Sequence, residues 1–322
     1  MPVNISARLK AFGVARALDY LEQDPDANFP RLMEWVDQYA GEKLSPPYRE
    51  LFHRVMTDPD NNWRRLIHSM YTDIDSRVLK KIFENFVIHG GLLEWPDLKA
   101  AGELGPERAP WSVIIDPSFP CAMGCGGCGA AIYGVRPVME FDSMDEVLIR
   151  RKAQGCHLFI VSSGDPLAKE EEAIALCNKH SDCVFAAFTP PGAITEKLCD
   201  DLLRVGNLFP AIRVDMDPAD AARAMGLLRA RKLPFGVACR CTAENADFVA
   251  TKPYYDLVVA AGAKFCWFFA CPAYGQAEPP TPEQLAAIHR RVKQFRKTEP
   301  LLTLDFWDGP GISGSALQGG KS

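Results

Sequence analysis

Short apolar runs alternate with longer amphipathic stretches over residues 111–300. The apolar runs predict strands at 111–116, 157–162, 184–188, 211–215, 235–239 and 264–269. Apolar positions at helical spacing predict helices between them at 143–154, 169–180, 195–204, 218–231 and 248–261. Apolar strands that alternate with helices are typical of a parallel sheet covered by helices, so we expect either an open doubly wound sheet or a closed or partial barrel. In each of these folds the function lies beyond the carboxyl ends of the strands.

Residues 1–110 show a different pattern, in which helical periodicity recurs without strand-like runs. The helical blocks are at 7–21, 30–39, 47–56, 63–71 and 78–89. Three pairs of a polar residue and a proline predict helix starts, namely Asp24-Pro25, Ser45-Pro46 and Asp58-Pro59. We interpret this region as a structural cap or lid on the following domain, with recognition of a substrate or partner as the alternative.

The composition places the chain among ordinary globular proteins. It has 322 residues, of which 48% are hydrophobic and 24% are charged, and its net charge is −5. This balance provides no basic field, so we expect no nucleic-acid binding. No apolar run is long enough to span a bilayer, and the start of the chain lacks the apolar core of a signal peptide. We therefore expect a cytoplasmic protein without a membrane span.

Eleven cysteines are many for a reducing compartment, and three of them lie within eight residues. These are Cys121, Cys125 and Cys128, in a glycine-rich loop directly after the first predicted strand. Glycines let a loop wrap an anionic centre and point backbone N–H groups at its sulfur atoms. Three thiolates on one loop suit a [4Fe-4S] cluster whose fourth iron stays open to a small molecule. Zinc, which favours four ligands, and unligated thiols are the alternatives.

This C-x3-C-x2-C loop after the first strand of a β/α repeat resembles the signature of the radical S-adenosylmethionine (SAM) superfamily. The run 111–134 around it is similar to bacterial members with a helical N-terminal region, as are the short stretches 58–63, 179–182, 233–236, 264–269 and 305–307. The resemblance implies a helical N-terminal domain at 1–110, a partial (β/α)6 TIM-like barrel at 111–300, and a C-terminal strand with a glycine-rich tail at 301–322. Those relatives usually continue into a cysteine-bearing C-terminal segment, which is absent here.

The resemblance also implies an activity. Cys121, Cys125 and Cys128 would ligate three irons of the cluster, and SAM would chelate the fourth. Reductive cleavage of SAM would then yield a 5′-deoxyadenosyl radical that abstracts hydrogen from an unidentified small-molecule, lipid or peptide substrate. The electron would come from a low-potential reductant such as flavodoxin or ferredoxin. The alternatives are a catalytically degenerate scaffold that keeps the cluster loop, and a zinc-binding structural protein.

The expected SAM contacts come from two places in the sequence. The Gly-Gly-Glu-Pro turn of the superfamily corresponds to Ser163, Gly164, Asp165 and Pro166, where a shorter carboxylate and a serine replace the usual residues. Arg213 and Asp215, at the end of the fourth predicted strand, are expected to meet the ribose or carboxylate of SAM, or else to form an ion pair. Two further departures are Gly127, where an aromatic residue is common, and the turn 189–192, which replaces the usual Thr-Asn-Gly.

The other eight cysteines are mostly expected in the core, because free cysteine is among the most buried residue types. Cys239, Cys241 and Cys271 lie at or beyond strand ends, so a second metal site or a thiol hydrogen donor is the alternative for them. The six histidines are scattered singly, and we expect surface or capped core positions for them.

Overall fold

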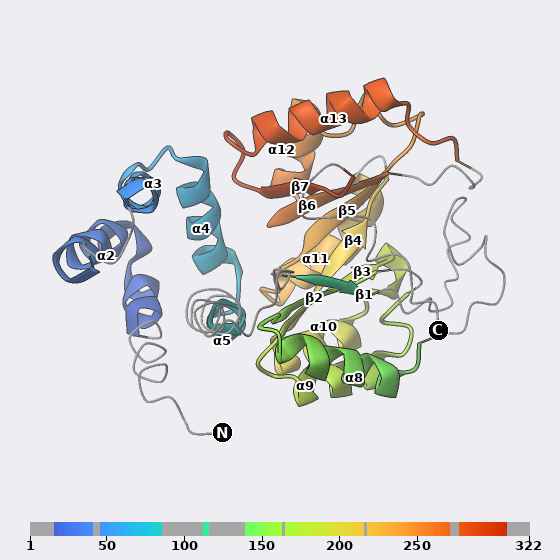
Figure 1. The fold of residues 1–322 in the computed structure, drawn as a ribbon, viewed down its shortest axis with the longest axis horizontal. Coiled ribbons are helices and arrows are strands. Elements are labelled where there is room, and N and C mark those ends of the chain that lie inside the picture. Colours follow the sequence, from blue (N-terminus) through green and yellow to red (C-terminus); the bar gives the residue numbers. More distant parts are fainter. Residues whose placement is uncertain are drawn as a thin grey trace.

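Seven parallel strands in sequential order form the centre of the protein (Figure 1). The computed structural model describes residues 16–40, 46–85, 112–115, 139–162, 165–215, 218–270 and 277–307. The strands are β1 (Val113–Ile115), β2 (Leu158–Val161), β3 (Val184–Thr189), β4 (Leu208–Arg213), β5 (Gly236–Cys241), β6 (Phe265–Ala270) and β7 (Leu302–Asp305). They form a half-barrel, so the predicted partial TIM-like barrel is confirmed, and the additional C-terminal strand pairs with β6.

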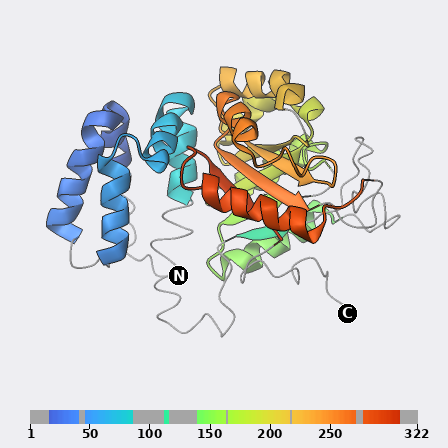
Figure 2. The same cartoon turned by 90° about the horizontal axis from the view of Figure 1, so that it is seen from above.

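Helices cover the outer face of this half-barrel (Figures 1 and 2). They are α8 (Phe141–Lys152), α9 (Glu170–Lys179), α10 (Glu196–Val205), α11 (Ala222–Ala230), α12 (Lys252–Ala260) and α13 (Pro282–Phe295), with short 3-10 turns at Pro191–Ala193 and Pro218–Ala221. Leu148, Leu202 and Val258 from the helices share one continuous core with Phe159 and Phe185 from the strands. Each such fully buried side chain contributes about 1.5–3 kcal/mol to folding.

The inner face is packed by side chains from the strands themselves. Its core contains Ile160, Ala186, Phe188, Ala211, Ala238, Phe265 and Trp267. β6 contributes the large aromatic rings, whereas β4 and β5 contribute alanines opposite them. The rings of Phe265 and Trp267 lie 4.4 Å apart and fill the space that these small residues leave.

Four helices of the N-terminal region are described in full. They are α2 (Pro25–Ala40), α3 (Pro46–Thr57), α4 (Asn62–Asp73) and α5 (Ser76–Phe83), and residues 16–23 are also helical. α2 begins at Pro25, as the Asp24-Pro25 pair predicts, and continues through Pro30, where the sequence analysis placed its start. Pro30 has no N–H to donate to the Asp26 carbonyl, and the Arg64 guanidinium of α4 donates to that oxygen at 3.4 Å instead. An arginine distant in sequence thus makes the proline tolerable.

The third predicted helix start, Asp58-Pro59, is wrong. Asp58 accepts a hydrogen bond from the Asp60 N–H within a turn. The helix begins at Asn62, because the Asn61 side chain accepts from the N–H groups of Trp63 and Arg64. A competing cap three residues downstream therefore sets the start.

The helical region binds the half-barrel at the amino ends of the strands. It contacts the segments that precede five strands, β3 to β7. Three side chains donate to backbone carbonyls there: Asn85 to Ser181 and Cys183 before β3, Lys81 to Val205 before β4, and Asn62 to Arg296 and Glu299 before β7. The backbone N–H of Asp75 donates to Lys232 before β5, and the Asp73 carboxylate pairs with Lys264 before β6. Ile74, Val78 and Leu79 extend the outer core into the same contact. The described part of this region thus lies at the end of the barrel opposite the carboxyl edge.

The fourth strand starts three residues earlier than predicted because its proline is tolerated. The Phe185 N–H donates to the Asn207 carbonyl and the Val214 N–H to the Ala238 carbonyl, so even-numbered residues of β4 direct their N–H groups toward β5. The first β4–β5 pair is Ala211 with Gly236, so Pro210 comes before that ladder begins. Its missing N–H therefore removes no ladder bond.

Within the described ranges, no helix has the length and apolar character to cross a membrane.

The close contact of Phe265 with β5 gives a test of inner-face packing. A Cβ atom on Gly236 would lie 2.3 Å from the Phe265 ring, so we expect Gly236→Ala to lower the free energy of unfolding by about 1–3 kcal/mol, measured in urea. Gly226→Ala in α11 is the matched control, because no atom lies within 4 Å of the added methyl group. That variant is expected to gain about 0.5–1 kcal/mol from helix propensity. Equal effects of the two substitutions would contradict the packing described here.

Candidate active site

The carboxyl ends of β1 and β2 lie side by side and lead to the two sequence stretches with predicted chemistry. Ile115, the last residue of β1, accepts a hydrogen bond from the Ser162 N–H just after β2. The loop with Cys121, Cys125 and Cys128 begins shortly after Ile115, and the predicted SAM turn begins after Ser162. The three cysteines, Ser163 and Gly164 lie outside the described residues, so the structure gives the edge from which both stretches leave and not their side-chain positions.

Asp165 lies at this edge in a half-buried position. Its side chain accepts a hydrogen bond from the Leu167 N–H at 3.2 Å, and its carbonyl accepts from Ala168, which folds 165–168 into a turn that contains Pro166. Burial raises the pKa of the Asp165 carboxyl above its usual range, while the Leu167 N–H and the Arg213 guanidinium oppose that shift. The structure therefore brings together two residues from separate predicted motifs, Asp165 and Arg213.

Asp215 pairs with an arginine from the next strand. Its Oδ2 lies 2.7 Å from Nη2 of Arg240, and its Oδ1 accepts from the Arg240 N–H at 3.3 Å. Arg213 and Asp215 continue the alternation of β4 beyond Ala211 of the inner core, and Arg240 continues that of β5 beyond Ala238. All three side chains therefore belong to the inner face at the carboxyl edge.

Asn245 holds the ends of β4 and β5 together. This side chain is 1% exposed and donates through Nδ2 to the carbonyls of Asp215 at 2.6 Å and Arg240 at 2.8 Å. Its Oδ1 accepts from the Thr242 N–H at 2.8 Å. One amide thus binds three backbone groups directly behind the Asp215–Arg240 pair and sets their spacing.

Aromatic rings line the inner face beneath these charged groups. Phe188 and Phe269 meet edge to face with centroids 4.7 Å apart, and Phe269 stacks on Phe306 at 4.5 Å. Trp267 lies 5.8 Å from Phe306 within the same inner core. Phe269 and Phe306 stay partly exposed, so apolar surface faces the carboxyl edge.

Similar structures place this geometry among known folds. Streptococcus suis SuiB matches with a TM-score of 0.51 at 12% identity over 66% of this chain and 52% of SuiB. SuiB bound to S-adenosylmethionine gives 0.53 at 12% identity, over 69% of this chain and 56% of that chain. SuiB bound to precursor peptide SuiA gives 0.50 at 12% identity, over 76% and 56%. SuiB is a radical SAM enzyme.

The chain thus shares the fold of SuiB, a partial barrel of parallel strands covered by helices. The resemblance stated from the cysteine loop is thereby confirmed at the level of the backbone. The match spans only about half the length of SuiB. No protein-family model matches the sequence, and neither does any curated protein.

The positions of Cys239 and Cys241 do not fit the alternative roles considered for them, a second metal site or a thiol hydrogen donor at the carboxyl edge. Cys239 and Cys241 do not face the carboxyl-edge site, because both are fully buried in the outer core between the strands and the helices. A hydrogen bond with the neighbouring Cys239 thiol, and then burial, raise the pKa of Cys241 far above its usual range, as expected for packed thiols. Cys271 lies outside the described residues. Arg240 is the site residue that the sequence analysis missed, although period-two alternation from Gly236 places it on the inner face.

Removing the amide of Asn245 tests the connection between β4 and β5. Asn245→Ala leaves the carbonyls of Asp215 and Arg240 without this donor, and we expect a loss of about 1–3 kcal/mol in urea unfolding. The exposed neighbour Glu244→Ala is the control and should change stability by less than about 0.5 kcal/mol. A neutral Asn245→Ala variant would show that the strand ends are held in another way.

Proposed function

We propose that the protein is a radical SAM enzyme whose [4Fe-4S] cluster is held by Cys121, Cys125 and Cys128. The observation that carries this proposal is the convergence of Asp165, Arg213 and the Asp215–Arg240 pair at the carboxyl edge of a half-barrel with the radical SAM fold. In the sequence the cysteine loop follows β1, whose end lies beside the end of β2, and the turn that contains Asp165 follows β2.

The residues at this edge fit the chemistry of SAM. SAM presents an amino group, a carboxylate and ribose hydroxyls, and the edge offers two carboxylates and two guanidinium groups. In the proposed site Asp165 accepts from the amino group, Arg213 binds the carboxylate, and Asp215, oriented by Arg240, accepts from the ribose. The cluster and SAM, when bound and reduced, would supply hydrogen-atom abstraction from the substrate. Asn245 acts through Asp215 and Arg240 and is a positioning residue.

The aromatic inner face supports a substrate with an apolar part. Phe188, Phe269 and Phe306 form a continuous contact surface next to the charged groups, which suits an apolar side chain or an acyl group. We favour a peptide, because a structure of SuiB holds a precursor peptide, with a small molecule or a lipid as the alternatives. In the proposed reaction the cluster receives its electron from a low-potential donor such as flavodoxin or ferredoxin. The cysteines of the protein must stay reduced to hold the cluster, and this suits the reducing cytoplasm.

Formation of 5′-deoxyadenosine tests the proposed activity. The full chain is reconstituted anaerobically with iron and sulfide, reduced with dithionite and given SAM. Production of 5′-deoxyadenosine that depends on the three loop cysteines supports the enzyme. A complete [4Fe-4S] cluster that never cleaves SAM supports the degenerate scaffold instead, and zinc without iron supports the structural zinc protein.

Cluster assembly should depend on the loop cysteines and on no buried core cysteine. Cys125→Ala is expected to lose the cluster, as judged by iron and sulfide content and by the visible absorption of the reconstituted protein. Cys199→Ala is the control, because Cys199 is fully buried in the outer core. Full iron and sulfide in the Cys125→Ala protein would refute the ligand assignment.

Arg213 should contribute a charge-assisted hydrogen bond to SAM. We expect Arg213→Gln to weaken SAM binding about 10-fold to 100-fold, which corresponds to about 1.4–2.7 kcal/mol, measured by calorimetry on the cluster-loaded protein. Arg204→Gln is the control, because Arg204 lies on the outside of α10 and pairs with Asp201. Similar affinities for the two variants would place the SAM carboxylate elsewhere.

A further inference from the structure

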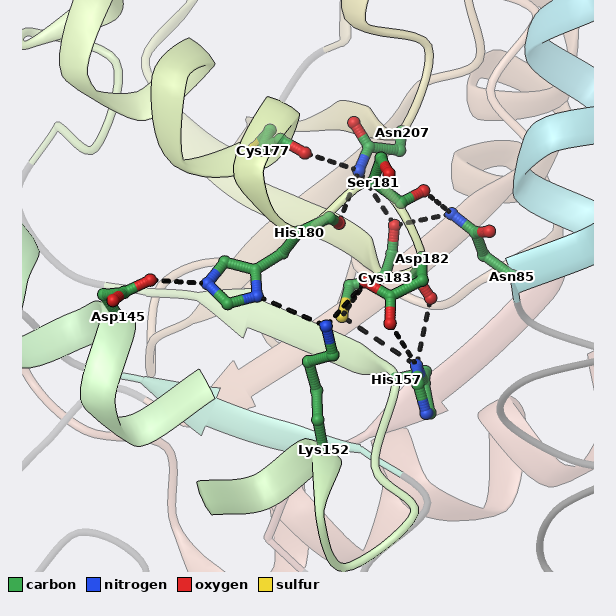
Figure 3. A network of polar contacts seen from close by, with 10 residues as sticks. All are labelled: Asn85, Asp145, Lys152, His157, Cys177, His180, Ser181, Asp182, Cys183 and Asn207. Atoms are coloured by element: carbon green, nitrogen blue, oxygen red, sulfur yellow. Dashed lines mark hydrogen bonds and ion pairs between the residues drawn. The ribbon is translucent and has the colours of Figure 1, made fainter. Parts of the chain in front are cut away.

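Three side chains that can ligate a metal meet at the amino ends of β2 and β3, on the opposite end of the strands from the cysteine loop (Figure 3). His157 immediately precedes β2, and Asp182 and Cys183 immediately precede β3. The parallel register pairs Leu158 with Val184, and the Val184 N–H donates to the His157 carbonyl at 2.8 Å. The pairing of the two strands therefore places His157 next to Cys183, although 26 positions separate them.

The ligand atoms have separations close to those around a bound ion. His157 Nδ1 lies 3.9 Å from Asp182 Oδ2 and 3.9 Å from Cys183 Sγ, and Cys183 Sγ lies 3.9 Å from Asp182 Oδ1. One ligand atom from each residue lies within 4.8 Å of the other two. Tetrahedral zinc with bonds of about 2.0–2.3 Å has ligands roughly 3.3–3.8 Å apart, so small side-chain movements would close the site.

We propose that His157, Asp182 and Cys183 form a second metal site that binds a transition ion, with zinc as the best fit. Imidazole together with a thiolate favours zinc and its neighbours over magnesium and calcium, which prefer all-oxygen sites. Cys183 is fully buried and His157 is 4% exposed, whereas the Asp182 side chain keeps 36% of its surface. Asp182 thus provides the side from which an ion reaches the two buried ligands.

The surrounding polar contacts hold these residues in place before any ion binds. The Cys183 carbonyl accepts from the side-chain amides of Asn85 at 2.8 Å and Asn207 at 2.9 Å. Lys152 Nζ lies 2.7 Å from Asp182 Oδ1, which leaves Oδ2 on the side of His157. His157 Nδ1 lies 3.0 Å from the Asp182 carbonyl and donates to it, so Nδ1 binds an ion only after it loses that proton and the ring turns away from the carbonyl. Without an ion, the same contacts form a hydrogen-bonded clasp.

The proposed ion would be structural. It would join the turn before β2 to the turn before β3, where Asn85 of the helical region also binds. This end of the barrel is remote from the carboxyl edge, so the site is independent of the proposed SAM chemistry. An ion that binds only the folded chain raises its stability in proportion to RT ln(1 + [ion]/Kd).

Zinc content and zinc coordination test the site. The full chain is prepared with its cluster. A second protein, the triple-serine protein, has Cys121, Cys125 and Cys128 all changed to serine, so that the loop does not bind zinc. After incubation with zinc and gel filtration, we expect about one zinc per chain in both proteins, with one sulfur ligand by X-ray absorption at the zinc edge. Because the triple-serine protein needs no cluster, failure of the proposed enzyme activity leaves this result unaffected.

Further substitutions in the triple-serine protein decide between an ion site and a cluster that is only hydrogen-bonded. Cys183→Ser and His157→Gln should each lower zinc affinity more than 10-fold, whereas Cys199→Ser, a buried cysteine of the outer core, should retain it. Zinc, and not magnesium, should also raise the unfolding temperature of the triple-serine protein without further substitution, which keeps the test valid if a variant folds poorly. The proposal would be overturned if the triple-serine protein bound no zinc, or if its Cys183→Ser variant bound zinc as tightly as the triple-serine protein itself.

Discussion

The parallel pairing of the seven strands is the constraint on which the rest of the structure depends. Because every strand runs in the same direction, all carboxyl ends meet at one edge and all amino ends at the other. Asp165, Arg213, Asp215 and Arg240 gather at the carboxyl edge for this reason, although they lie in or just after the ends of three different strands. The same geometry collects the turns at the amino edge, where the helical region binds. The candidate site and the contacts with the helical region thus occupy opposite ends of one sheet.

Buried asparagines hold both edges in register. Asn245 binds the ends of β4 and β5 at the carboxyl edge, while Asn85 and Asn207 bind the turn before β3 at the amino edge. Each amide satisfies backbone carbonyls that would otherwise be buried without a partner. This explains how a parallel sheet, whose strand ends leave backbone groups outside the ladder, keeps its turns fixed on both sides. The backbone at Asp215 and Arg240 is therefore set by a neutral amide, in addition to the ion pair between their side chains.

The inner and outer faces of the strands have different functions. The outer face is covered by six helices among the described residues and takes up Cys239, Cys241 and Cys266 as packed apolar side chains. The inner face is filled from one side by the rings of β6, which lean over the small residues of β4 and β5. This asymmetry leaves aromatic surface next to the charged edge, where a substrate with an apolar part finds both kinds of contact.

Local sequence was sufficient to predict the alternation of strands and helices, the helical N-terminal region and the edge at which the candidate residues Asp165, Arg213 and Asp215 lie, because apolar periodicity and loop composition are properties of consecutive residues. It placed the α4 helix correctly at 63–71 but offered Asp58-Pro59 as its start, where Asn61 is the cap instead, and it put the start of β4 three residues late, where the pairing geometry tolerates Pro210. It paired neither Asp215 with Arg240 nor His157 with Cys183, since both contacts join neighbouring strands. The orientation of Cys239 toward the helices was likewise decided by the sheet. The sequence by itself determines which side chains can form a site and on which strand each one lies. The distances between these side chains follow from strand register, which is a property of the whole sheet.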